Sequence, residues 1–294
     1  LHPFGVRVRD KRDRWEEAVQ AIMPMFTRDS WEFHGKYHDF PARNVVPKPM
    51  QKPHPPLWVA CSNIRTIGEA GQWGMGALGF SFVSPDAAKA WVHKYYNQFL
   101  HNPRRLTDYA DNPNIAIVNG FMCARTDEEA LEKAAGWTFF IFALGYYGRK
   151  GVDAPGKGNL WAEYQDWRKT DKAQEALRNG LIGSPETIRK RLRQFEDAHV
   201  DQVILLNQAG KTSHQDICDS LELFANEVMP ESHGRHAEHE AWKKQVLGGN
   251  IVLPDLDTDR YDLYSHQNED IVRLTPQQLK DMMAAKERAA VAGD

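Results

Sequence analysis

Two hydroxyl side chains, Ser62 and Thr66, have a spacing that suits the binding of an anion. They belong to the segment Cys61-Ser62-Asn63-Ile64-Arg65-Thr66, which follows a short apolar run and opens an amphipathic stretch. This pattern predicts the end of a strand and the start of a helix. The first N–H groups of a helix have no partner within the helix and can bind a phosphate together with hydroxyl groups, with Arg65 adding charge. The same pattern also fits Ser62 as an ordinary helix cap.

Two other patterns are weaker. Gly74-Met75-Gly76 lacks the third glycine of a dinucleotide-binding fingerprint and precedes a strand instead of following one. His233, His236 and His239 are three residues apart and could share one face of a helix, as metal ligands do. No carboxylate or cysteine completes a set of ligands with a recognisable spacing, so we expect a solvated polar helix and no metal site.

The composition excludes several classes of partner. The 294 residues include 37 Lys and Arg against 40 Asp and Glu, a net charge of -3, which leaves no basic excess for nucleic acid. No apolar run approaches the roughly 18 to 20 residues that a membrane span needs. Cys61, Cys123 and Cys218 lie far apart and form no C-x-x-C pair. They are therefore predicted to be reduced core thiols of a cytoplasmic protein.

From residue 57 onward, short apolar runs of strand type alternate with amphipathic stretches of helix type. Several helices have local start signals: Ser84 and Ser184 are each followed by proline, and a capping box opens at Thr126. Four strand-then-helix units in a row are typical of a parallel sheet covered by helices, so the predicted fold class is α/β. The predicted strands are residues 57–61, 77–82, 115–123 and 201–206.

The region after the third predicted strand interrupts this alternation. A helix from about residue 126 to 147 leads into a glycine-rich stretch at 148–158, and aromatic residues continue to Trp167. Long loops in compact domains usually have a function, so residues 147–167 are predicted to form a mobile cover. Helix packing is the simpler expectation for Trp137, Phe139, Phe140 and Phe142.

The composition changes after Pro230, where charge rises and apolar periodicity is lost. A clear helix start returns only near residue 275, and that helix is expected to continue to residue 290. We therefore divide the chain into a part at 1–230 and a polar C-terminal extension at 231–294, and we expect residues 231–274 to wrap the domain or a partner.

The order of several short blocks resembles the bacterial-luciferase-like flavin-dependent monooxygenases. The resemblance covers roughly residues 4–230, and the segment after 231 has no counterpart in it. It rests on Phe33-x-Gly35-x-Tyr37, on Pro47-Lys48-Pro49-x-Gln51-x-Pro53-x-Pro55-Pro56 before a strand, on Ser62-x3-Thr66-x3-Ala70-x3-Gly74, on Gly183-Ser184-Pro185-Glu186 and on the run from 201 to 230.

The resemblance implies a TIM (β/α)8 barrel whose cofactor lies at the carboxyl ends of the strands. It places the flavin phosphate at Ser62 and Thr66, with Asn63 between them, and it places Phe80 against the isoalloxazine ring. Four units make half of a barrel, so residues 1–230 would be about its C-terminal half. The catalytic residues would then lie in the other half, and we name none.

The implied activity is that of a flavin-dependent monooxygenase that uses reduced FMN and O2 to oxygenate a small organic substrate. A flavin reductase would supply the reduced flavin, and a homo-oligomer is expected. Two alternatives stay open: a deazaflavin-dependent oxidoreductase of the same superfamily, and a non-catalytic partner subunit of a luciferase-like heterodimer. A half barrel would also leave the edge of its first strand unpaired, so we expect the isolated chain to be prone to aggregation.

Overall fold

In a computed structural model, the chain forms one compact unit, Leu1–Thr258, and a second segment, Asp259–Asp294. The structure describes residues 10–80, 82–101, 103–109, 111–150, 159–171, 173–174, 180–207 and 212–256. The predicted terminal helix at 275–290 and most of the predicted glycine-rich stretch lie outside these residues.

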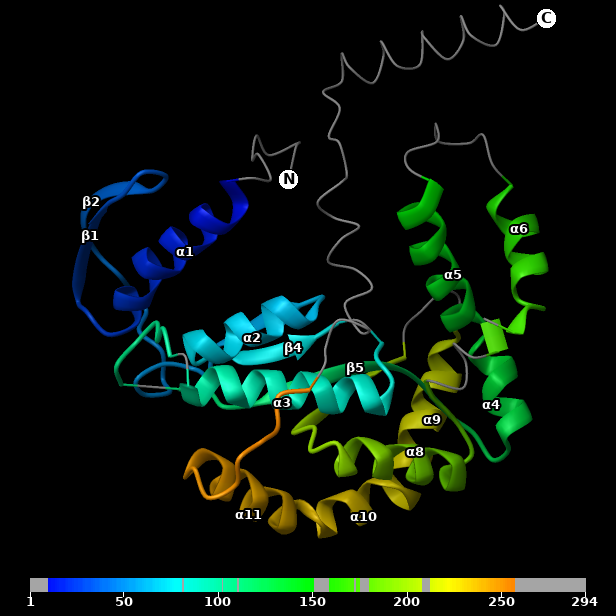
Figure 1. Cartoon of the computed structure of the whole chain (residues 1–294). Coiled ribbons are helices and arrows are strands. Elements are labelled where there is room, and N and C mark those ends of the chain that lie inside the picture. The colour runs from blue at the N-terminus through cyan, green and yellow to red at the C-terminus, as the bar shows by residue number, and fades with distance from the viewer. Residues whose placement is uncertain are drawn as a thin grey trace, which may run out of the picture. The chain divides into compact units, whose positions relative to one another are not determined.

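The unit is built on a parallel sheet, which confirms the predicted α/β class (Figure 1). Strands β3, β4 and β5 are neighbours in sequence order, and β7 pairs with β5 along residues 116–120. The short strand β6 pairs with the last three residues of β5, and the sequence analysis missed it because it has three residues. The strands are β3 (Trp58–Cys61), β4 (Gly76–Gly79), β5 (Ile115–Cys123), β6 (Leu181–Gly183) and β7 (Gln202–Leu206).

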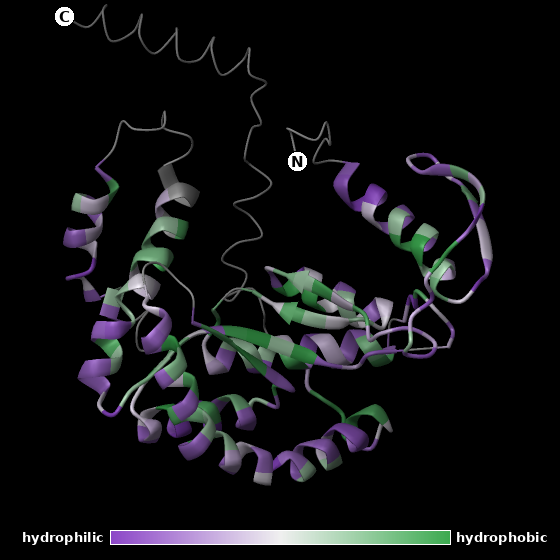
Figure 2. Ribbon diagram, turned by 180° about the vertical axis from the view of Figure 1, so that it is seen from behind, coloured by the Kyte–Doolittle hydropathy of each residue, from purple (hydrophilic) through white to green (hydrophobic). Residues whose placement is uncertain are grey.

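Helices cover one face of this sheet and bury its largest side chains. Ile115, Ile117 and Phe121 of β5 pack in one core with Trp91 and Tyr95 of α3. Met122 of the same strand packs in a second cluster, so β5 is buried on both faces along its length, and most of its residues are hydrophobic (Figure 2). The covering helices are α2 (Ile64–Trp73), α3 (Pro85–His101), α8 (Pro185–Asp197) and α9 (His214–Glu227).

The predicted helix starts at Ser84, Thr126 and Ser184 are confirmed. Each hydroxyl accepts a backbone N–H three residues on, at 3.3, 3.2 and 3.4 Å respectively. These caps satisfy N–H groups that have no partner inside the helix.

The opposite face of the sheet is partly open. Within the described residues, β3, β4, β5 and β7 follow one another in an open parallel sheet, with β3 and β7 at its two sides. Phe80, just after β4, is 44% exposed and Ile204 of β7 is 37% exposed. The carboxyl end of this face is covered by helices from the region after β5.

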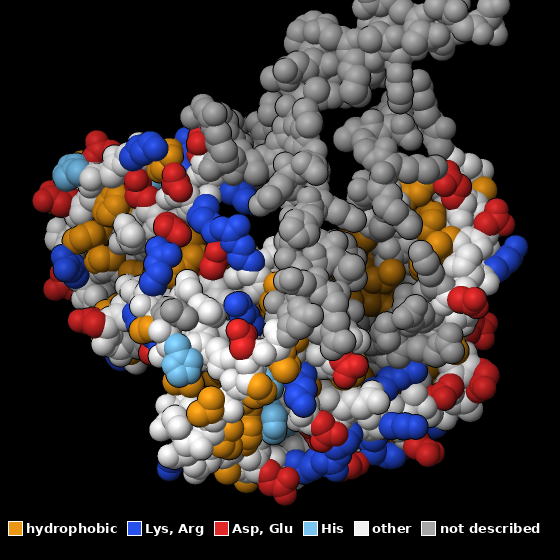
Figure 3. Space-filling model, viewed as in Figure 1, with side chains coloured by type: hydrophobic (Ala, Val, Ile, Leu, Met, Phe, Trp, Pro, Cys, Tyr) orange, Lys and Arg blue, Asp and Glu red, His pale blue; other side chains and the backbone are white. Residues whose placement is uncertain are grey.

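That region forms three helices, α4 (Asp127–Lys133), α5 (Ala135–Lys150) and α6 (Leu160–Trp167). The single helix expected from 126 to 147 is wrong, because the chain breaks at Ala134 between α4 and α5. Phe139 and Phe142 of α5 pack against Tyr164 of α6, with ring centroids 5.1 and 5.7 Å apart. Hydrophobic side chains reach the surface on this side (Figure 3), where Trp161 is 60% exposed.

The N-terminal part of the unit combines a helix and a hairpin. Glu17 of α1 accepts the backbone N–H groups of Lys36, Tyr37 and His38 at 2.9, 2.7 and 2.7 Å, which fixes the hairpin loop to the helix. Trp15 of α1 stacks on Trp73 of α2 with ring centroids 4.4 Å apart. The elements are α1 (Lys11–Ile22), the 3-10 helix η3 (Met23–Phe26), β1 (Ser30–His34) and β2 (Asp39–Asn44).

The first part of the expected C-terminal extension packs on the same unit. It forms α10 (Met229–Gly234) and α11 (His236–Leu247), and Val246 of α11 is fully buried. Trp242 of α11 contacts Tyr96 of α3 at 5.8 Å between ring centroids. Within the described ranges, no helix is long and apolar enough to cross a membrane.

Candidate cofactor site

The segment Cys61–Thr66 joins the carboxyl end of β3 to the first turn of α2, as predicted. Asn63 has an extended backbone and its Oδ1 accepts the N–H of Thr66 at 3.0 Å, so Asn63 is the N-cap. The alternative in which Ser62 caps this helix is therefore wrong. Ser62 is exposed one residue before the cap, at the same carboxyl edge of the sheet.

The hydroxyl of Thr66 is half-buried and turned back toward the cap. Its Oγ1 donates to the backbone oxygen of Asn63 at 2.9 Å and lies 3.2 Å from Asn63 Oδ1. A phosphate bound here would compete with the Asn63 carbonyl for this proton. Local side-chain to backbone bonds of this kind are readily exchanged, because they stabilise the helix little.

The charges around this helix start favour an anion. The first turn of α2 carries no acidic residue, whereas α4, α8 and α9 each have Asp or Glu in their first turns. The positive end of the α2 dipole is therefore not compensated by its own side chains. Arg65 lies on this turn, and its Nε donates to Glu69 at 3.2 Å. Arg12 of α1 also pairs with Glu69, at 2.7 Å, which balances that carboxylate.

The neighbouring thiol is not a nucleophile. Cys61 is 1% exposed, and its Sγ lies 3.4 Å from the backbone oxygens of Val59 and Thr66. Burial raises its pKa to about 12, so the thiol stays neutral. Cys123 is also buried, and burial raises its pKa to about 11. The expectation of a core thiol is wrong for Cys218, which is exposed on α9.

Phe80 lies beside the start of α2. Its backbone N–H donates to the carbonyl oxygen of Cys61 at 2.8 Å, which joins the carboxyl ends of β3 and β4. Its ring is partly exposed and contacts Phe82 at 5.0 Å between centroids. The structure thus brings Ser62, Asn63, Thr66 and Phe80 to the same edge of the sheet.

The aromatic group continues from Phe80 into the interior. Phe82 packs against Trp137 and Phe140 at 4.8 and 5.9 Å between centroids. Trp137 lies on the sheet at Gly120, where a Cβ atom would come within 2.2 Å of the indole ring. Helix packing, the simpler expectation, is therefore confirmed for Trp137 and Phe140, which pack α5 onto the sheet. The sequence signal for this contact was a glycine inside an otherwise apolar strand.

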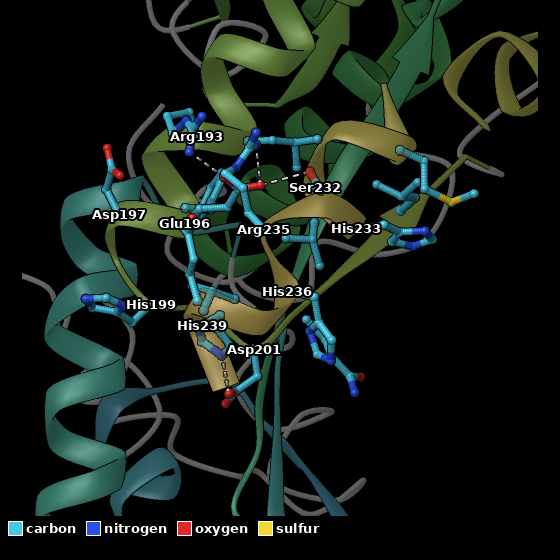
Figure 4. A pocket seen from close by; sticks show the side chains of 18 of the residues that line it. Arg193, Glu196, Asp197, His199, Asp201, Ser232, His233, Arg235, His236 and His239 are labelled. Atoms are coloured by element: carbon cyan, nitrogen blue, oxygen red, sulfur yellow. Dashed lines mark hydrogen bonds and ion pairs between the residues drawn. The ribbon is translucent and has the colours of Figure 1, made fainter. Parts of the chain in front are cut away.

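A cavity lies elsewhere, at the amino end of β7. It has a volume of about 750 Å³ and lies between α8, β7, α10 and α11 (Figure 4). Its polar groups are mutually paired: Arg235 contacts Glu196 at 2.7 Å, and His239 Nε2 lies 2.8 Å from Asp201. These pairs hold helices to the sheet, and they lie at the opposite end of the strands from Ser62.

The three histidines of the C-terminal region are divided between two helices. His233 lies on α10, while His236 and His239 lie on α11. The expected solvated helix is wrong for α11, because His239 bonds to buried Asp201 and Val246 is in the core. In the part of the chain that the structure describes, no cluster of three or more His, Cys, Asp or Glu side chains could hold a metal ion.

Comparison with known proteins places this geometry in a family. The chain is 26% identical over 225 residues to the oxygenase component of the flavin-dependent trigonelline monooxygenase of Acinetobacter baylyi, which covers 74% of this chain and 59% of that protein. It is 25% identical over 226 residues to the FMNH2-dependent dimethylsulfone monooxygenase of Pseudomonas putida, covering 74% and 57% respectively. The chain therefore spans less than two thirds of the length of these relatives.

A solved structure with the same fold is the coenzyme F420-dependent tetrahydromethanopterin reductase of Methanopyrus kandleri. The TM-score is 0.54 at 20% identity, and the match covers 75% of this chain and 62% of that one. The α/β fold is accordingly that of the luciferase-like TIM barrels, represented here by consecutive strand-helix units. Residues 1–202, more than half of the chain, match the family model for luciferase-like monooxygenases. The chain belongs to the luciferase-like monooxygenase family.

Proposed function

We propose that this chain provides the flavin-binding edge of a monooxygenase that uses reduced FMN and O2 to oxygenate a small organic substrate. The observation that carries the proposal is the start of α2. Its first turn has no acidic side chain, and it lies beside a partly exposed aromatic ring at the carboxyl edge of a parallel sheet. Ligands of parallel α/β proteins bind at this edge.

Each residue has a distinct role in this proposal. The backbone N–H groups at the start of α2 and the hydroxyls of Ser62 and Thr66 would hold the phosphate of FMN. Asn63 would fix the turn through its bond to the Thr66 N–H. Phe80 would pack against the isoalloxazine ring and exclude water from it. When bound, reduced flavin supplies the activation of O2, which no side chain can provide.

The donor set fits this group. A phosphate needs donors and a positive potential, and the start of α2 offers both without a carboxylate in its first turn. The relatives that use flavin include one named as an oxygenase component, so we propose that a separate reductase delivers the reduced flavin.

The test is FMN binding by the double variant Ser62→Ala with Thr66→Ala. We expect FMN affinity, measured by quenching of flavin fluorescence, to fall about tenfold or more, because two phosphate donors are lost. The matched control is Ser213→Ala, which removes the cap of α9, a helix with Asp216 in its first turn. It should lower stability by about 1 kcal/mol and leave FMN affinity unchanged. Unchanged FMN affinity in the double variant would refute the assignment.

A deazaflavin-dependent oxidoreductase is the second candidate, and the likeness to a coenzyme F420-dependent reductase supports it. Oxygen uptake with reduced FMN supports the monooxygenase. Hydride transfer with the deazaflavin and no oxygen uptake supports the alternative. If neither flavin binds while the chain still forms oligomers, a non-catalytic partner subunit is the remaining function.

A further inference from the structure

The indole of Trp137 carries a buried N–H group without an acceptor. The side chain is 4% exposed, and its Nε1 has no hydrogen-bond partner among the residues that the structure describes. Buried donors in folded proteins are nearly always paired, because leaving one unpaired costs free energy. Each buried donor that stays unpaired needs an explanation, and a ligand that supplies the missing acceptor is one.

The surroundings of this N–H are apolar and planar. Gly120 lies under the indole ring, Phe82 meets it edge-on at 85°, and Phe140 lies 5.7 Å away between centroids. The remaining members of the cluster are also apolar: Met122, Ala124, Ala130, Ala134, Ile182 and, at its margin, Ile141 and Leu206. A charged ligand would be poorly solvated here, so the cluster suits an uncharged ring compound.

Phe82 lies between the indole ring of Trp137 and the partly exposed Phe80. Its φ angle is 52°, a left-handed conformation that a bulky residue rarely adopts. Its ring bridges the partly exposed Phe80 and the buried Trp137. Strain of this kind is typical of positions that move when a ligand binds. A ligand that enters beside Phe80 would therefore reach the indole by displacing Phe82.

We propose that Trp137 forms the floor of a substrate subsite for a planar, uncharged ring compound with a carbonyl oxygen. The ring takes the place of the Phe82 side chain, and the carbonyl oxygen accepts the indole N–H. The proposal rests on the proposed function, because it names the substrate class of that site. The isoalloxazine of the flavin has the same chemistry, and the experiment separates the two.

The experiment follows the indole N–H of Trp137 by NMR in protein with ¹⁵N-labelled tryptophan. The chain has nine tryptophans, and the resonance of Trp137 is identified by its loss in Trp137→Phe. Acetophenone, which has the ring and the carbonyl, should shift this resonance downfield, whereas ethylbenzene, which lacks the acceptor, should not. The affinity for acetophenone should fall about tenfold in Trp137→Phe and stay unchanged in Trp161→Phe, where the side chain is exposed.

A second variant covers the case in which Trp137→Phe does not fold. Phe82→Gly removes the ring over the indole and accepts the left-handed backbone without strain. We expect it to bind acetophenone several-fold more tightly than the unaltered protein. Equal or weaker binding would overturn the role of Phe82 as the displaced group.

Further measurements decide whether the carbonyl that accepts the indole N–H belongs to the substrate or to the flavin. If FMN alone moves the Trp137 resonance and Trp137→Phe weakens FMN binding tenfold, the indole serves the flavin and the proposal is overturned. The same holds if acetophenone and ethylbenzene act alike. Absence of FMN binding by the unaltered chain would contradict the proposed function and leave the acetophenone result standing, so the two failures are distinguishable.

Discussion

Removal of the Asp201 carboxylate should destabilise the whole unit, because four donors from three elements, β5, α3 and α11, meet on it. The side chain is 3% exposed. It accepts the N–H of Ile115 at 2.7 Å and the hydroxyl of Tyr96 at 2.8 Å. His239 Nε2 lies 2.8 Å away and Lys243 Nζ lies 3.1 Å away, both on α11. The perturbation is Asp201→Asn, which keeps the size and removes the charge.

The expected cost follows from what the change leaves behind. Lys243 is 8% exposed, and its charge would keep the amide oxygen of Asn114, at 2.6 Å, as an uncharged partner. Breaking a buried ion pair by removing one partner costs about 3 to 5 kcal/mol. Domains are stable by about 5 to 15 kcal/mol, so Asp201→Asn should remove about a fifth of the stability or more.

Urea unfolding followed by tryptophan fluorescence measures this cost. With an m-value of about 3 kcal/mol/M, the midpoint should fall by about 1 to 2 M. The matched control is Asp197→Asn, an exposed residue at the end of α8, which should change stability by less than about 0.5 kcal/mol. Adding Lys243→Met should restore part of the loss, with a coupling of about 1 to 3 kcal/mol.

Equal midpoints for Asp201→Asn and Asp197→Asn would refute the reasoning. That result would mean that α11 is not part of the same cooperative unit.

Three further predictions test packing, pH dependence and the open face. Gly71→Ala should lower the free energy of unfolding by about 1 to 3 kcal/mol, because the new Cβ would lie 2.4 Å from the Tyr95 carbonyl oxygen. The control is Gly68→Ala in the same helix, where the new Cβ meets a flexible side chain. Thermal unfolding should show that this control is neutral or stabilising. Burial, helped by neighbouring cations, lowers the pKa of His199 from 6.5. Its contribution to the free energy of unfolding is therefore complete above that pH and is lost as the pH falls below it. His199→Phe should flatten the dependence of stability on pH between pH 7 and 5, and an unchanged slope would contradict this. Ile204→Lys should reduce light scattering by the concentrated chain, because a charge on an edge strand blocks sheet-to-sheet association; a chain that is already monodisperse without the substitution would exclude the predicted aggregation.

The succession of strands and helices could be predicted because its signals are local. Apolar runs mark β3, β4, β5 and β7, and hydroxyl caps mark the starts of α3, α4 and α8. The break at Ala134 could not be predicted, because residues on both sides favour a helix. The buried face of α11 could not be predicted for another reason. One of its buried positions is Lys243, whose charge is balanced by Asp201, far away in the sequence.

For the candidate site, the sequence identified the segment but not its hydrogen bonds. The pattern around Ser62 and Thr66 located the helix start, yet the choice of Asn63 as its cap depends on backbone angles. The contact between Trp137 and Gly120 joins residues 17 positions apart on either side of a helix break. Apolar periodicity describes one element at a time. It can predict that Trp137 lies on the buried face of a helix, but not which strand residue it contacts.

The two ends of the sheet are built from different chemistry, and this separates stability from binding. At the amino end, charged groups such as Asp201 and Lys243 are buried and paired, so they fix the helices. At the carboxyl end, the start of α2 lacks an acidic residue and Trp137 keeps an unpaired N–H, so both can gain a partner from a ligand. A parallel sheet favours this division, because its strands all end, and its ligands bind, at one edge. Asp201→Asn, studied where it is still folded, should therefore keep the affinity for FMN and acetophenone, and a parallel loss of both affinities would contradict the separation.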